Sequence, residues 1–91
     1  MIEGKTKSGF KFKVDPRIQK DWRLINAIVN AQSEDATLKL QATVEMVKLI
    51  LGDQEELFMN HIMNKNDGFL PMEVINTEIT EIIQAIPKAK N

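Results

Sequence analysis

The feature that most constrains this chain is a helix-breaking junction near its middle, at residues 51–53. Gly52 can take the left-handed backbone conformation that ends a helix at little cost, so we expect a helix to end there. We expect Asp53 to cap the next helix, with Glu56 three residues later completing a capping box. The sequence therefore predicts two helices joined by a very short connection.

A second junction follows at residues 66–68, where Asn, Asp and Gly form a turn signal. Pro71 lies where a further helix begins, because proline is tolerated in a first helical turn. We expect one helix from Asp53 to about residue 65 and a last helix from Pro71 to Pro87. Residues 88–91 are expected to form a flexible tail.

The N-terminal segment has the period of a strand. Apolar residues Phe10, Phe12 and Val14 alternate with charged ones, and a Ser-Gly turn precedes them. We therefore expect a short β-hairpin within residues 1–14.

The next segment begins with Asp15 as helix cap and Pro16 in the first turn. Apolar residues then recur at helical spacing as far as residue 29, so we expect one helix ending near residues 31–33. Across the whole chain we expect a set of large apolar residues to be buried, namely Trp22, Ile25, Val44, Val47, Phe58 and Ile79.

Residues 37–51 fit two patterns, because their apolar residues alternate as in a strand and also recur at helical spacing. Most of them are good helix formers and the segment ends at Gly52, so we predict a helix buried on more than one side. The fold class expected is mainly α: four helices with a short N-terminal β-hairpin. We expect a single domain over residues 1–91, with a helical body at 15–87.

Composition narrows the function classes. The chain has 91 residues, of which 43% are hydrophobic and 27% charged, and it has no cysteine, so a folded intracellular domain is expected. No apolar run is long enough to span a bilayer, and no secretory signal is recognisable. Residues 1–23 carry a net charge of +4 and residues 24–91 a net charge of −5.

No catalytic, cofactor or metal site is predicted. His61 is the only histidine and is expected to lie on a helix surface without a nucleophile beside it. An EF-hand register with Gly68 at loop position six places Met63, Lys65 and Val74 at ligand positions, so calcium binding is not expected. Hydrolytic, transferase and metal-dependent activities are therefore not expected.

Two sets of residues are candidates for binding. The last helix has a heptad-like seam that can face its own bundle or a partner helix. Two methionines one turn apart can fill the core or form an adaptable apolar patch for a partner. These candidate partner-binding residues are Met72, Ile75, Ile79, Ile82, Ile86, Met59 and Met63. The candidate self-association residues in the basic hairpin are Lys11, Lys13, Phe10 and Phe12.

The uneven charge is consistent with an ordinary solvated surface. If copies of the chain do associate, the opposite charges of the two ends favour head-to-tail self-association that weakens as salt concentration rises. A single-stranded nucleic acid stacked on the two phenylalanines is an alternative, but the acidic remainder of the chain makes nucleic-acid binding unfavourable.

The order of several short signatures resembles a known family. Asp21-Trp22, Leu51-Gly52 with an acidic helix start, Asp67-Gly68 before Pro71, and an isoleucine-rich last helix follow one another. This order resembles the small tail assembly chaperones of long-tailed bacteriophages and prophages of Gram-positive bacteria.

The resemblance implies a non-enzymatic protein of the host bacterial cytoplasm. It implies binding to the tape measure protein, whose apolar helices are kept from aggregating until tail-tube subunits coat them. It also implies self-association, and in many members a longer form made by frameshifting. The alternative is a small DNA-binding or antitoxin-like regulator that uses the basic hairpin as a ribbon.

Overall fold

The computed structural model describes residues 1–86, so Pro87 and the tail expected at 88–91 lie outside the described residues. In chain order the elements are β1 (Ile2–Lys5), β2 (Lys11–Val14), the 3-10 helix η1 (Pro16–Lys20), α1 (Trp22–Ala31), α2 (Ala36–Leu51), the 3-10 helix η2 (Gly52–Gln54), α3 (Glu55–Lys65) and α4 (Met72–Ala85). The expected fold class, mainly helical with a short N-terminal hairpin, is confirmed.

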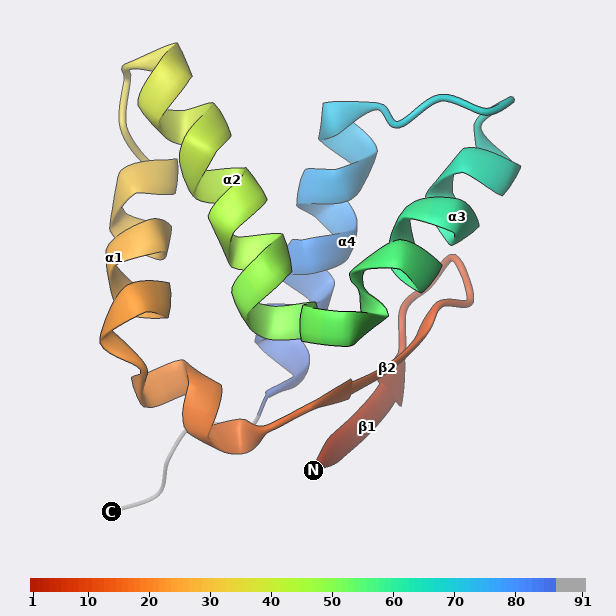
Figure 1. Cartoon of the computed structure of the whole chain (residues 1–91), viewed down its shortest axis with the longest axis horizontal. Coiled ribbons are helices and arrows are strands. Elements are labelled where there is room, and N and C mark those ends of the chain that lie inside the picture. Colours follow the sequence, from red (N-terminus) through yellow and green to blue (C-terminus); the bar gives the residue numbers. More distant parts are fainter. Residues whose placement is uncertain (87–91) are drawn as a thin grey trace.

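α2 lies next to each of the other three helices, and its closest packing is with α1. In Figure 1, α1 lies beside α2, and α4 runs behind the space between α2 and α3. The hairpin lies below α3, and the connection after β2 leads to η1 and α1 at the other side. The N-terminal strands therefore support the end of the molecule where α2 turns into α3.

The hairpin is antiparallel, with Ile2 opposite Val14 and Gly4 opposite Phe12. Phe12 and Val14 point into the core and are almost fully buried, as the alternation predicted. A Cβ on Gly4 would lie 2.6 Å from Cζ of Phe12, so this aromatic ring occupies the space beside the glycine. The ring thus replaces the missing side chain on the inner face, an arrangement that stabilises glycine in a strand.

The helix expected to start at Asp15 is interrupted, which corrects the prediction of one continuous helix. Asp15 does act as cap, accepting a hydrogen bond from the backbone N–H of Arg17, but the segment it begins is η1. Asp21 then has an extended backbone and caps α1 through the N–H of Arg23. A short aspartate competes with the helix for backbone donors, so a second cap six residues after the first starts a second helix.

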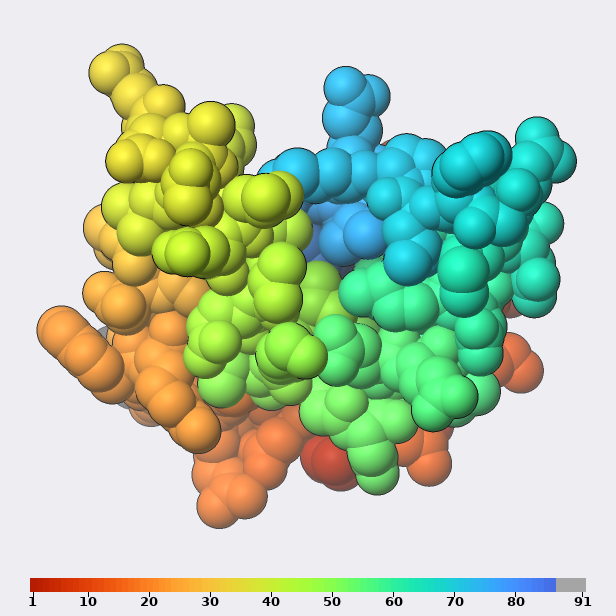
Figure 2. All heavy atoms as spheres, turned by 45° about the horizontal axis from the view of Figure 1, so that its top comes forward, coloured from red at the N-terminus to blue at the C-terminus, as the bar shows by residue number. Residues whose placement is uncertain are grey.

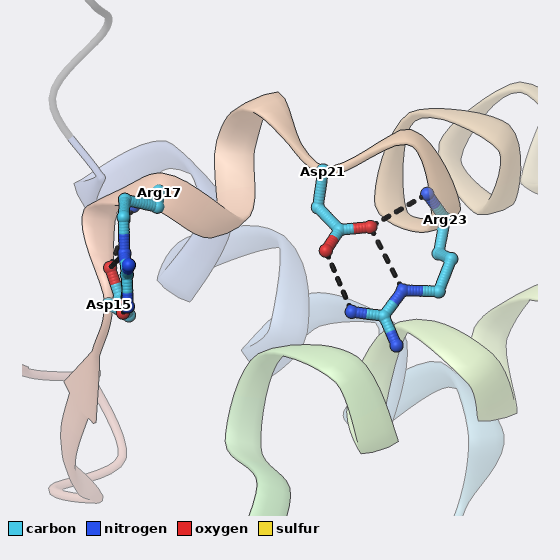
Figure 3. A network of polar contacts seen from close by, with 4 residues as sticks. All are labelled: Asp15, Arg17, Asp21 and Arg23. Atoms are coloured by element: carbon cyan, nitrogen blue, oxygen red, sulfur yellow. Dashed lines mark hydrogen bonds and ion pairs between the residues drawn. The ribbon is translucent and has the colours of Figure 1, made fainter.

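The two caps have the same arrangement, drawn in Figure 3. In each, the arginine two residues on places its guanidinium against the carboxylate of the capping aspartate, with a shortest N–O distance of 2.7 Å. The hydrogen bonds that each guanidinium donates to its aspartate are the main reason that the pKa of Asp15 and that of Asp21 are both lowered to about 2.

The helix expected at 37–51 is confirmed as α2, and Gly52 ends it with a φ of 54°. The prediction that Asp53 caps the next helix is wrong. No side chain caps α3, and Asp53 lies within η2. The backbone N–H of Gly52 still binds a carbonyl of α2, so the chain continues through η2 directly into α3 and needs no separate start.

The turn at residues 66–68 is also confirmed. Asp67 and Gly68 both have positive φ, and the N–H of Gly68 binds the carbonyl of Met63 at 2.8 Å. Pro71 has an extended backbone directly before α4, where the sequence places a helix start.

The core lies where the hairpin, α2, α3 and α4 meet. Val47, Phe58 and Ile79 are buried as expected, and the ring of Phe10 packs edge-to-face on Phe58 at 5.1 Å between centroids. The expected burial of three other residues is wrong: Trp22, Ile25 and Val44 are 76%, 41% and 49% exposed. α1 packs against α2, and its buried residues are Leu24 and Ala27. The apolar stripe of α1 that carries Trp22 faces outward.

Candidate binding groove

An apolar groove opens between α2 and α4, and we call it the α2–α4 groove. Figure 2 shows the surface hollowed between α2 and the segment leading into α4, with the blue atoms of α4 visible deep in the hollow. Its volume is about 220 Å³. The residues that line it are Leu40, Thr43, Val44, Val47, Glu55, Met59, Leu70, Met72 and Ile75.

Local structure explains how the walls are built. Leu40 and Val44 lie one turn apart on α2, and each leaves about half of its surface exposed. Val47, one turn deeper, is 1% exposed and closes the floor. The opposite wall comes from Met59 on α3 and from Leu70, which precedes α4. Side chains four residues apart share one helix face, so α2 presents a continuous apolar wall.

The polar groups of the α2–α4 groove are engaged with their own neighbours. Thr43 donates to the carbonyl of Lys39 at 3.1 Å, and Glu55 forms an ion pair with Lys48 at 3.5 Å. The remaining lining is aliphatic or thioether. At about 220 Å³ the hollow is smaller than the ~300–1,000 Å³ of sites for drug-sized ligands. Its chemistry therefore suits one or two apolar side chains of a larger partner.

The structure brings together part of the predicted partner-binding set. Met59, Met72 and Ile75 line the α2–α4 groove, whereas Met63 is half-buried outside it. For the rest of the seam, the prediction of a partner-binding surface is wrong. Ile79, Ile82 and Ile86 are at most 5% exposed and belong to the core. The heptad-like spacing marks the side of α4 that packs on its own domain, because that side is covered by the hairpin and the other helices.

Sequence reasoning missed Leu40, Val44 and Leu70 as groove residues. The available signal is the wide apolar face of the segment at 37–51, from which the sequence predicts burial on more than one side. One of those sides is instead the open wall of the α2–α4 groove. A periodicity shows how wide an apolar face is, but only the packing shows which part of it remains uncovered.

The predicted self-association residues are also partly buried in the core and partly exposed. Phe10 and Phe12 are core residues, at 6% and 3% exposed, so they are unavailable to a second copy in this fold. Lys11 and Lys13 are exposed on the outer face of the hairpin.

A buried polar cluster joins the hairpin turn to the helices. Oε1 of Glu78 accepts hydrogen bonds from the hydroxyls of Thr6 and Ser8, both at 2.7 Å. Nε2 of His61 lies 2.9 Å from Oγ of Ser8. His61 lies on α3 and is half-buried. The hydroxyl of Ser8 beside it corrects the expectation of a surface histidine without a nucleophile nearby.

This cluster differs from a serine–histidine–acid triad, in which the histidine lies between the other two groups. Here Ser8 is in the middle and directs its proton to the carboxylate of Glu78. The cluster ties the turn at residues 6–10 to α3 through His61 and to α4 through Glu78. These hydrogen bonds hold the hairpin turn against the helices.

Within residues 1–86, no three potential metal-ligating side chains lie close enough to hold an ion. In the same range, no helix combines the length and the apolar character needed to cross a bilayer. The fold and groove define a small helical domain that carries an N-terminal hairpin and an open apolar groove. Comparison with protein-family models, curated proteins and solved structures gives no match.

Proposed function

We propose that this protein is a phage tail assembly chaperone that binds the tape measure protein and prevents its aggregation in the cytoplasm of a bacterial host. The α2–α4 groove takes apolar side chains from one face of a tape measure helix. The observation that carries the proposal is this groove, with its half-exposed Leu40 and Val44 and its two methionines. The order of signatures from Asp21-Trp22 to Pro71 supports the choice of family.

The lining suits a helix as partner. An amphipathic helix binds a groove through side chains spaced three or four residues apart, and Leu40 and Val44 form a wall with that same spacing. Met59 and Met72 face this space from two other elements, and flexible thioethers adapt to irregular apolar partners. A tape measure helix offers many similar apolar side chains in succession, so a shallow adaptable site serves it better than a deep specific pocket.

The experiment is co-expression with fragments of the tape measure protein encoded by the neighbouring gene, followed by pull-down. Val44→Asp places a charge in the groove wall at a position that is 49% exposed, so the fold should survive. We expect this variant to capture at least about tenfold less fragment, since an unpaired charge must be desolvated on binding.

Val29→Asp is the matched control, because Val29 is also a helical valine and is 62% exposed, but on α1 outside the groove. It should capture the fragment as the unchanged protein does. Loss of capture with Val29→Asp and not with Val44→Asp would move the binding surface to the exposed stripe of α1. No capture by the unchanged protein would contradict the chaperone proposal.

One observation favours the regulator as a second candidate. Lys5, Lys11 and Lys13 share the exposed outer face of the hairpin, where they outnumber Glu3 on the strands and Asp53 beside them. A DNA-binding ribbon would bind the upstream region of its own gene with an affinity that falls steeply with salt. Fluorescence anisotropy with that DNA separates the two functions: specific binding abolished by K11E/K13E supports the regulator, and its absence supports the chaperone.

A further inference from the structure

The hairpin has one occupied edge and one open edge. On the outer side of β2, the side chain of Gln54 binds both the N–H and the carbonyl of Lys13, at 2.8 and 2.6 Å. The backbone groups of Lys13 therefore point away from β1. In an antiparallel pair, two directly opposed residues direct their backbone N–H and carbonyl groups either both toward the partner strand or both away from it. Glu3 is opposite Lys13, so its backbone groups point away from β2.

The alternation of the ladder extends this result along β1. Thr6 donates its N–H to the carbonyl of Phe10, so residues 2, 4 and 6 face β2. Residues 3 and 5 then direct their N–H and carbonyl groups to the opposite edge, which lies at the margin of the molecule (Figure 1). Among the described residues, no hydrogen bond from outside the hairpin reaches these groups.

We propose that the open edge of β1 pairs antiparallel with β1 of a second copy of this chain, with Gly4 on the two-fold axis. The two hairpins then form one four-stranded sheet. In this register Glu3 lies opposite Lys5 of the second copy, and Lys5 opposite its Glu3. These are the two residues whose backbone groups are free, so each opposed pair can exchange both of its hydrogen bonds.

Charge complementarity selects a second copy as the occupant. Glu3 and Lys5 are exposed on the same face of β1, and the two-fold axis brings each beside the opposite charge. Directly opposed unlike charges stabilise strand pairing, whereas like charges oppose it. A lysine on a short edge strand normally prevents pairing, but here the second copy supplies the carboxylate that neutralises it.

Gly4 suits the position on the axis. The ring of Phe12 already covers its inner face, at the place where a Cβ would lie. Two glycines can therefore face each other across the axis without displacing a side chain. The contact is isologous, so it differs from the head-to-tail contact expected from the overall charge distribution, and it does not depend on the tape measure proposal.

The test is a charge exchange followed by sedimentation equilibrium, at protein concentrations from about 10 µM to about 1 mM because so short a contact is weak. E3K leaves two lysines facing two lysines, and K5E leaves two glutamates facing two glutamates. Each variant alone should dimerise roughly tenfold more weakly than the unchanged chain.

An equimolar mixture of E3K and K5E should regain dimerisation, because each lysine then meets a glutamate of the other variant. The double exchange E3K/K5E should regain it as well. K11E is the control, since it makes the same charge change on the same face but on β2, and its dimerisation should stay within about threefold of the unchanged chain.

Three results would overturn the inference. One is an unchanged chain that stays monomeric over the whole concentration range. Another is a mixture that associates no better than its two components. The third is K11E weakening association as much as K5E, which would instead support a head-to-tail contact through the basic face.

Discussion

The side-chain amide of Gln54 pairs with the backbone of Lys13 as a neighbouring strand would. Its oxygen accepts from the N–H at 2.8 Å, and its nitrogen donates to the carbonyl at 2.6 Å. The same nitrogen also donates to the carbonyl of Leu51 at 3.2 Å. One residue of η2 therefore fixes the end of α2 and the outer edge of β2 together.

Gln54→Ala should lower the free energy of unfolding by about 1–2 kcal/mol, because partly exposed hydrogen bonds each contribute about 0.5–1.5 kcal/mol. Urea denaturation measures this. The matched control is Gln41→Ala, which truncates an exposed glutamine of α2 and should change stability by less than about 0.5 kcal/mol. Equal losses in the two variants would show that the contact with Lys13 contributes nothing specific.

Trp22→Ala should leave the thermal melting of the protein nearly unchanged, since the indole is 76% exposed. Phe58→Ala should cost about 3–5 kcal/mol, because Phe58 is fully buried in the core. Trp22 is also the only tryptophan, so its fluorescence should be readily quenched by added iodide. A shielded indole, or unfolding of Trp22→Ala, would contradict the exposed position.

Glu78→Ala should destabilise the fold by about 1–3 kcal/mol, since Thr6 and Ser8 would lose their shared acceptor in a buried site. Combined with Ser8→Ala in a double-mutant cycle, it should show a coupling of at least about 0.5 kcal/mol. Glu81→Ala is the control, because Glu81 accepts an exposed N–H, that of Lys7, and its loss should matter less. Additive effects of Glu78→Ala and Ser8→Ala would show that the two side chains act independently.

The aspartate caps should make stability depend on acid pH. The pKa of Asp21 is lowered from 3.8 to about 2, first by the side-chain hydrogen bond from Arg23 and then by its backbone N–H. A carboxyl group whose pKa is lower in the folded state than in the unfolded state stabilises the fold. This stabilisation is complete at pH values above the unfolded-state pKa and is lost as the pH falls through the folded-state pKa. The melting temperature should therefore fall between about pH 4 and pH 2.

Carboxyl NMR titration should give midpoints near pH 2 for Asp15 and Asp21. Arg23→Gln should return the pKa of Asp21 toward 3.8 while leaving that of Asp15 low, because Asp15 has its own arginine at position 17. A parallel change at both aspartates would show that the cause is the overall charge and not the paired guanidinium.

Several elements could be predicted because their causes are local. The hairpin follows from alternation beside a turn, the end of α2 from the conformational freedom of Gly52, and the turn before α4 from Asp67 and Gly68. The break at Asp21 was also a local event, but one helical periodicity ran through both η1 and α1 and hid it. In that segment a capping aspartate outweighed an uninterrupted apolar stripe.

The sequence by itself determined which segments are helical, where the hairpin lies and how wide each apolar face is, because these depend on neighbouring residues. Only the tertiary structure decided which part of each face is covered. Trp22 is exposed and Ile79 buried although both lie on apolar helix stripes, since α1 contacts α2 on one side while α4 is enclosed on several. The α2–α4 groove is the part of those apolar surfaces that the chain, with its helices placed in this way, leaves uncovered.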